Sequence, residues 1–186
     1  MKRFLTLLIV SGFIHAQPLE RNRISLSGGW TEQLYPPNFD YRQTAPTVGL
    51  SYGYRAAKFL EIEAGISVGL QPGQDVCSRF GCSNPNDRYI WIPIGVRFIA
   101  PLVAGRVELS AGGGGLIQRY SVSNPDNPYS IASENSLGGY FTTGAAAALD
   151  HRRRFWLGAT PRFLLANPEF RRYRWFQITG DVSFRF

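Results

Sequence analysis

Few side chains in this chain have the types and spacing that catalysis requires. The two histidines are His15 and His151, and a histidine acting as general base has to lie within hydrogen-bond reach of its nucleophile. Serines such as Ser121 and Ser130 are the hydroxyls that it would have to reach. The glycines at 112–115 suggest a phosphate loop, but no Lys-Ser/Thr pair follows them and no helix begins there. A strand that needs small side chains, where a wall bends or an interior is crowded, is the better interpretation.

The two cysteines are a second candidate for chemistry. Cys77 and Cys82 lie within residues 71–88, the longest stretch without alternating polarity. A metal site would need two further ligands, and no histidine is available to supply one. In an exported chain an oxidising compartment favours a disulfide. We predict a structural disulfide that fixes the tip of this loop, with a pair of free thiols as the alternative.

Most of the remaining chain consists of segments in which apolar and polar residues alternate. Such a period of two is typical of strands with one apolar and one polar face. Each segment is about 9 to 14 residues long, whereas a tilted strand needs roughly 9 to 11 residues to cross a bilayer and strands of soluble proteins average about 5 to 6. The eight segments are residues 23–34, 47–55, 60–70, 89–99, 106–119, 137–149, 155–165 and 176–186.

The connections between these segments alternate in length. Long connections are expected at residues 35–45, 71–88, 120–136 and 166–172, and short ones at 56–58, 100–105 and 150–154. Short periplasmic turns and longer extracellular loops are typical of outer-membrane barrels. An even number of strands then places both termini on the periplasmic side. Pro93 and Pro161 remove ladder donors inside two strands, and we predict a local bulge at each.

Several charged residues fall on the polar, inward face of these segments. The position of each residue along its strand places seven of them in the periplasmic half of the lumen. Arg162 is expected further from the periplasmic end. Isolated buried charges are very costly, so opposite charges in so narrow a space are expected to pair. We predict a plug of ion pairs, with a selectivity filter as the alternative. The members are Glu61, Glu63, Arg97, Arg106, Glu108, Arg162, Asp181 and Arg185.

The two ends of the chain carry features of export. Lys2 and Arg3 precede a mostly apolar stretch, residues 4–14, and Ala16 offers a small residue for cleavage. This is the layout of a secretory signal peptide, residues 1–16, and it falls short of the roughly 20 residues that a spanning helix needs. The final strand alternates up to the last residue, with an apolar face made by Phe176, Ile178, Val182, Phe184 and Phe186.

Taken together, these features resemble the small eight-stranded outer-membrane barrels, the OmpA-transmembrane or OmpX-like group. The resemblance implies an all-β fold, an eight-stranded antiparallel up-and-down transmembrane β-barrel formed by residues 17–186. It also implies the outer membrane of a Gram-negative bacterium, contact with its lipid and lipopolysaccharide, and a last strand that the barrel assembly machinery reads. A soluble secreted barrel or sandwich is the rival fold, and would need another layer over the outward face of residues 60–70.

The resemblance also bears on function. Barrel enzymes of the outer membrane use a histidine near the outer face, whereas His151 is expected in a periplasmic turn and His15 leaves with the signal peptide. We therefore expect a monomeric, non-enzymatic protein without cofactors that has a structural role or binds an unknown extracellular ligand or surface through its loops. A narrow porin for small solutes or ions is the alternative.

The surface residues complete the expectations. The net charge of +7 could suggest nucleic-acid binding, but the arginines are scattered through alternating strands of an exported chain. Arg171, Arg172 and Arg174 are expected at the outer rim, where their guanidinium groups would suit lipopolysaccharide phosphates; a solvated charge cluster is the alternative. Candidates for interfacial aromatic girdles, with lumen or loop packing as the alternative, are Trp30, Tyr52, Tyr54, Tyr89, Tyr173 and Trp175.

Overall fold

The fold follows from a computed structural model of the chain. It describes residues 20–34, 44–71, 76–78, 81–83, 86–123, 132–166 and 173–186; of these, the side chains of residues 70–87, 122–123, 132 and 173 are not described. The expected signal peptide, residues 1–16, therefore lies outside the described residues. No helix in the described part of the chain is long and apolar enough to cross a membrane.

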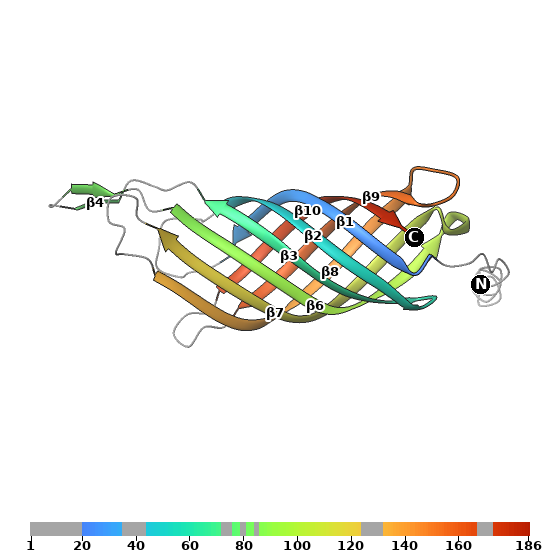
Figure 1. The fold of residues 1–186 in the computed structure, drawn as a ribbon, viewed down its shortest axis with the longest axis horizontal. Helices are drawn as coiled ribbons and strands as arrows, with labels where there is room; N and C mark the ends of the chain where they lie inside the picture. Colours follow the sequence, from blue (N-terminus) through green and yellow to red (C-terminus); the bar gives the residue numbers. More distant parts are fainter. Residues whose placement is uncertain are drawn as a thin grey trace, which may run out of the picture.

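Eight antiparallel strands close into a barrel (Figure 1). Each barrel strand pairs with the next barrel strand along the chain, and β1 closes the barrel by pairing with β10. The all-β, eight-stranded up-and-down fold predicted from the alternating segments is thus confirmed. The strands are β1 (Asn22–Gln33), β2 (Thr44–Ala57), β3 (Leu60–Gln71), β6 (Asn86–Leu102), β7 (Val107–Ser123), β8 (Ala132–Ala148), β9 (Phe155–Ala166) and β10 (Tyr173–Arg185).

Two short strands that the sequence did not predict lie outside the barrel. They are β4 (Val76–Ser78) and β5 (Gly81–Ser83), which pair with each other in the connection between β3 and β6. Cys77 and Cys82 are register partners in this hairpin. Their side chains are outside the described residues, so the disulfide stays a prediction that the backbone register favours.

The two ends of the barrel differ in their connections. The backbone groups of Asn22 and Phe186 hydrogen-bond to each other at 3.0 Å, so the barrel strands begin and finish at one end, which we call the terminal end. The connections at residues 58–59, 103–106 and 149–154 also lie there, and the opposite end is called the loop end. Strands β6, β7 and β8 extend further toward the loop end than predicted. The connection at 167–172 is no longer than the one at 149–154, so the predicted alternation in length is only partial.

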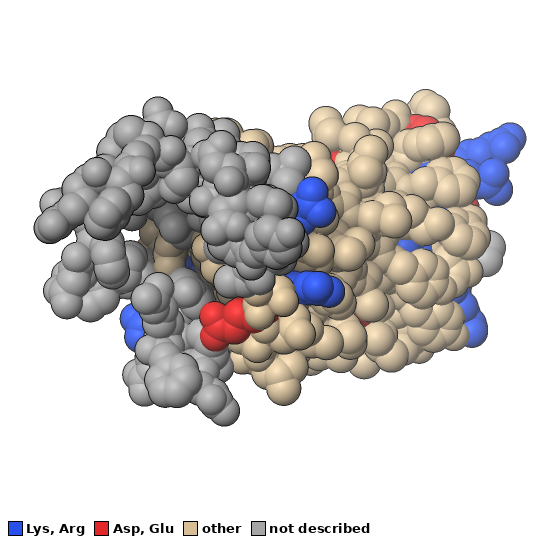
Figure 2. Space-filling view, turned by 60° about the vertical axis from the view of Figure 1, so that its left-hand side comes forward, with Lys and Arg blue, Asp and Glu red and all other residues tan. Residues whose placement is uncertain are grey.

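The outer wall is apolar and exposed. The outward side chains follow the predicted alternation, and Leu26 on β1 and Phe98 on β6 are 65% and 62% exposed. Figure 2 shows a broad band between the two ends of the molecule that consists mostly of uncharged side chains. Soluble monomers rarely expose a continuous apolar surface of this kind, so the wall requires a nonpolar environment.

The predicted bulges at Pro93 and Pro161 are wrong. The pairing of β6 with β3 lapses after Ala64–Ile94 and resumes at Ser67–Trp91 in the same register, while the pairing of Pro93 with β7 is continuous. Pro161 behaves likewise, with a lapse toward β8 and continuous pairing with β10. Each proline lacks one N–H and so interrupts one side of its strand without inserting a residue. The Thr142 hydroxyl donates to the Pro161 carbonyl at 3.2 Å and occupies part of that gap.

The glycines of β7 allow close approach of the neighbouring strand. A Cβ atom added to Gly114 would lie 2.2 Å from the carbonyl oxygen of Ile94 and 2.5 Å from the Cα of Gly95, both on β6. A Cβ atom on Gly112 would lie 2.2 Å from the carbonyl oxygen of Val96. The glycine run therefore has the structural role expected from the sequence.

This close approach predicts the effect of one added methyl group. Gly114→Ala forces β6 and β7 apart and should lower the free energy of unfolding by about 1–3 kcal/mol, the usual cost of overpacking. Gly28→Ala is the matched control, because a Cβ atom there meets nothing within 4 Å. Urea unfolding of the two variants in lipid vesicles would measure the difference, and equal stability of both would contradict the strand geometry.

Candidate functional site

The inward face of the strands forms two clusters of ion pairs and an aromatic cluster. The first ion-pair cluster lies at the terminal end and is centred on Glu108 of β7. Arg185 of β10 donates from Nη1 to Glu108 Oε1 at 2.9 Å and from Nη2 to the other carboxylate oxygen. Arg55 of β2 donates to Glu108 Oε1 from the opposite wall, at 3.1 Å. The Arg185 guanidinium also stacks on the Trp156 ring, 3.9 Å from its centroid, so four strands are tied across this end.

The second ion-pair cluster lies next to the first and is centred on two glutamates of β3. Arg23 Nη2 is 2.6 Å from Glu61 Oε1 and 3.5 Å from Glu63 Oε2. Arg97 of β6 donates to Glu63 Oε2. All four side chains are buried, where breaking one pair leaves an uncompensated charge.

Tyr140 of β8 connects the charged part of the lumen to an apolar part. Its hydroxyl donates to Glu63 Oε1 at 3.1 Å, while its ring belongs to a buried cluster further toward the loop end. The closest ring pair of that cluster is Tyr89–Trp175, with centroids 4.7 Å apart. The aromatic cluster comprises Tyr89, Trp91, Leu116, Tyr140, Leu164 and Trp175, with Tyr120 packed against it.

Polar side chains line the wall between these groups. Asp181 accepts hydrogen bonds from the hydroxyls of Thr160 and Thr179. Arg162 is buried and donates to Gln177 Oε1 at a long 3.5 Å. Trp91 Nε1 donates to Gln118 Oε1 at 3.0 Å. The lumen is therefore occupied by side chains from its terminal end to its aromatic cluster.

Most residues of the predicted plug face the lumen, but one does not. Glu61, Glu63, Arg97, Glu108 and Arg185 form ion pairs as described. Asp181 and Arg162 face inward, and their hydrogen-bond partners among the described residues are hydroxyl and amide groups.

The prediction for Arg106 is wrong. It lies exposed in the turn after the 3₁₀ segment η1 (Val103–Gly105), where its Nη2 is 2.8 Å from His151 Nδ1. Because β7 begins only at Val107, the inward alternation of its strand does not extend to Arg106.

Sequence reasoning missed two members, Arg23 and Arg55. Their positions share the parity of the inward residues Ser25 on β1 and Ser51 on β2, so the alternation itself could have found them. The aromatic candidates divide in the same way. Trp30, Tyr52 and Tyr54 are exposed on the wall, whereas Tyr89 and Trp175 are buried in the lumen; the side chain of Tyr173 is not described.

The remaining predicted residues lie on the wall or outside the described residues. Arg174 is exposed near the loop end, while Arg171 and Arg172 lie outside the described part of the chain. Five terminal-strand residues are all exposed on the wall, as their parity requires, and their role in assembly stays a prediction. They are Phe176, Ile178, Val182, Phe184 and Phe186.

The second cluster predicts a large difference between two arginines. Arg97→Gln leaves the buried Glu63 without its closest cation, and loss of one partner of a buried pair costs about 3–5 kcal/mol. Arg106→Gln makes the same chemical change at an exposed position and should cost less than about 1 kcal/mol. Urea unfolding in vesicles, followed by tryptophan fluorescence, would compare them. A similar loss in both variants would exclude a buried ion-pair role for Arg97.

Comparisons with known proteins give relatives by structure alone. No family model and no curated protein matches the sequence. Neisserial surface protein A (NspA) superimposes with a TM-score of 0.68 at 14% identity, over 89% of this chain and 97% of that one. Ail of Yersinia pestis, solved in complex with the heparin analogue sucrose octasulfate, gives 0.60 at 11% identity over 89% and 99%. OprG of Pseudomonas aeruginosa gives 0.56 at 12% identity over 89% and 97%.

These likenesses extend over nearly the whole of each barrel, at identities that establish the fold alone. They agree with the strand order, the closed register and the apolar wall of this chain. The chain thus has the fold of the small eight-stranded outer-membrane β-barrels, the OmpA/OmpX-like group that its alternating strands and terminal strand indicate.

Proposed function

We propose that this chain is a non-enzymatic outer-membrane protein whose closed barrel is a scaffold for a structural or loop-mediated binding role. The observation that carries the proposal is the filled lumen. Glu108 holds arginines of β2 and β10, Glu63 holds arginines of β6 and β1, and the aromatic cluster fills the barrel above them. Eight strands enclose an interior just wide enough for such side chains, so the loops remain the part available for a ligand.

The apolar wall supports a location in the outer membrane of a Gram-negative bacterium. Lipid is the environment that accepts outward apolar side chains as exposed as Leu26 and Phe98. We infer that the expected signal peptide directs export, that the barrel assembly machinery reads the terminal strand, and that both termini face the periplasm. The loop end then faces the exterior.

The arrangement of titratable groups supports a role other than catalysis. In the lumen Glu61, Glu63 and Glu108 are engaged in ion pairs. His151 lies at the terminal end, bonded to Arg106, and a general base there would face the periplasm in the proposed orientation. Among the described residues these three carboxylates and this histidine are thus engaged with arginines, whereas a general base has to be available to its nucleophile.

Cations on the outer wall near the loop end support contact with lipopolysaccharide. Arg88 of β6 and Arg119 of β7 are both exposed, and the register places Arg88 opposite Ser121 and Arg119 opposite Ile90. The two outward arginines are thus diagonal neighbours on adjacent strands, and Arg174 is exposed at the same end. Two adjacent guanidinium groups repel each other unless an anion lies between them, and phosphate suits their geometry. Ail, a barrel of the same fold, was solved with a polyanionic heparin analogue, which supports anionic ligands at such a rim.

The proposed location predicts the behaviour of the protein in cells. The full chain should fractionate with outer membranes and resist extraction by urea, because its apolar wall is immersed in lipid. Unheated samples should migrate differently from boiled ones on gels, since a closed barrel resists detergent. A soluble periplasmic protein with unaltered mobility would contradict both the location and the closed barrel.

The filled lumen predicts low conductance. In planar bilayers the unmodified barrel should give only small, irregular currents. Arg97→Gln loosens one ion-pair cluster but leaves the aromatic cluster in place, so its conductance should stay low; adding Trp91→Ala and Trp175→Ala should raise it. Large, steady channels from the unmodified protein would favour the alternative function, a narrow porin.

A further inference from the structure

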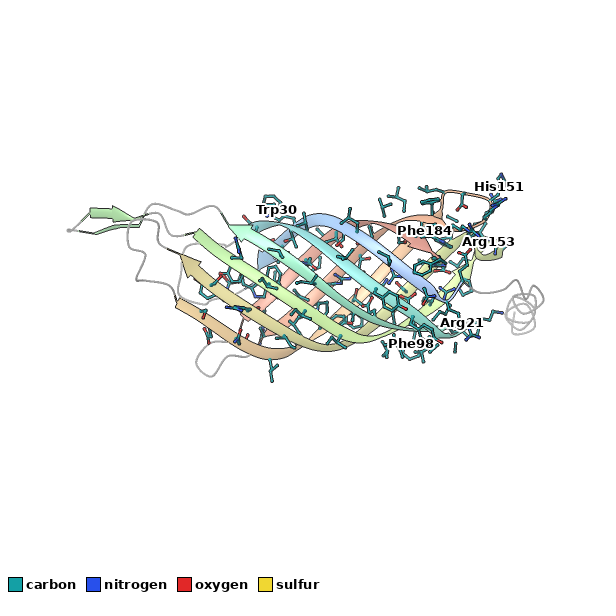
Figure 3. The ribbon with its side chains drawn as sticks, viewed as in Figure 1. Arg21, Trp30, Phe98, His151, Arg153 and Phe184 are labelled. Carbon is teal, nitrogen blue, oxygen red and sulfur yellow. The ribbon has the colours of Figure 1, made fainter. Side chains whose placement is uncertain are left out.

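Cationic side chains surround the terminal end of the barrel. Figure 2 shows Lys and Arg side chains at the right-hand rim, and Figure 3 places Arg21, His151 and Arg153 at that end. They come from the residue before β1 and from all three short turns. We call this set the collar; its members are Arg21, Lys58, Arg106, Arg152, Arg153 and Arg154.

Acidic side chains only partly balance the collar. Among the described residues of this end they are Glu20 and Asp150. Glu20 pairs with Arg154 at 3.1 Å. Asp150 accepts a hydrogen bond from the N–H of Phe155 at 3.0 Å. Slight desolvation acts to raise the pKa of the Asp150 carboxyl. Hydrogen bonds from backbone N–H groups, that of Phe155 first, outweigh the desolvation and lower this pKa. With both carboxylates charged, a marked excess of positive charge remains at the rim.

Three collar arginines make no ion pair with the described residues. Arg21 and Arg152 are exposed. Arg106 contacts a ring nitrogen of His151, and this nitrogen carries no negative charge. A guanidinium has five N–H donors in a planar fork. These groups therefore offer donors to an anionic ligand without breaking an internal pair.

Exposed apolar side chains occupy the same turns. Val103 and Leu149 are 70% and 64% exposed. Phe155 is also exposed and directly follows Arg154, and the Lys58 ammonium is 5.4 Å from the centroid of the Phe59 ring. Cations beside apolar anchors are typical of side chains at the boundary between hydrocarbon and head groups.

The turn at η1 supports this placement independently. Val103, Ala104 and Gly105 have φ of 48°, 54° and 76°, and a positive φ is rare for a β-branched residue. Such strain persists where surrounding structure or function requires it. Here the strained turn exposes Val103 three residues before Arg106, an arrangement that suits a lipid boundary better than water.

We propose that the collar binds the phosphate groups of anionic glycerophospholipids in the leaflet at the terminal end. The proposal rests on the bilayer location of the barrel, and in the proposed orientation this leaflet is the periplasmic one. Nucleic acids and acidic soluble proteins would be attracted by the cations but not by the apolar side chains of the same turns. A phospholipid satisfies both, with acyl chains against the wall and phosphate against the guanidinium groups.

Lipid selectivity in nanodiscs would test the proposal. The full-length folded barrel is placed in discs of phosphatidylcholine with a minor share of phosphatidylglycerol, and native mass spectrometry measures the lipids that it retains. We expect several-fold enrichment of phosphatidylglycerol, reduced in roughly 1 M salt, where the screening length falls to about 3 Å. The triple variant Arg21→Gln, Arg106→Gln and Arg152→Gln should lose most of the enrichment.

A charge-preserving variant at the same positions separates the cations from the shape of the turns. Arg21→Lys, Arg106→Lys and Arg152→Lys keeps the positive charge of the collar and should keep most of the enrichment. Equal loss in both triple variants, equal retention in both, or competition by millimolar inorganic phosphate would overturn the proposal. Heat-modifiable mobility verifies that each variant is folded. Because the assay needs only a bilayer, failure of the outer-membrane location in cells would remain distinguishable from failure of the collar.

Discussion

The interior of this barrel depends on how it neutralises buried carboxylates, and Glu63 shows the constraint most clearly. One of its oxygens accepts from Arg97 and lies 3.5 Å from Arg23, and the other accepts from Tyr140 at 3.1 Å. A carboxylate in so narrow a space is stable only when its lone pairs are occupied. The partners come from β1, β6 and β8, while Glu63 itself is on β3, so one side chain links half of the barrel strands. Closing the sheet is what brings these partners together.

The same constraint explains why the lumen has a charged part and an aromatic part. Tyr140 supplies a hydroxyl to Glu63 and a ring to the cluster of Tyr89 and Trp175, so it satisfies the polar requirement on one side and the packing requirement on the other. Gly95 makes room for it, because a Cβ atom there would lie 2.6 Å from the Tyr140 hydroxyl oxygen. Small residues on β6 and β7 and a large one on β8 therefore form one packing unit.

Sequence alternation predicted which face of each strand meets the lumen, because a period of two needs no knowledge of partners. It failed where the strand ended. Arg106 follows three residues with left-handed backbone conformation. The alternation of β7 therefore does not apply to Arg106, and its even spacing from Glu108 does not place it in the lumen. Residue type alone left the girdle and the lumen open for Tyr89 and Trp175, and both follow the alternative, lumen packing. The pairing itself, such as Arg55 with Glu108, could not be predicted, since it joins strands far apart in sequence through the register and closure of the barrel.

The charged residues of this chain lie where their surroundings make a charge least costly. Inside the lumen, cations are held mostly by carboxylates; on the wall facing outward, the middle of each described strand carries none; at the two ends, arginines are exposed. A charge in the hydrocarbon layer is expensive, and the cost falls toward the interfaces. Arg106, in the turn just before β7, and Arg119, near the far end of that strand, are exposed at opposite boundaries, while Glu108 between them points inward to its arginines. One strand thus meets three environments, and in each of them the sequence places charge only where an opposite charge or a polar boundary can receive it.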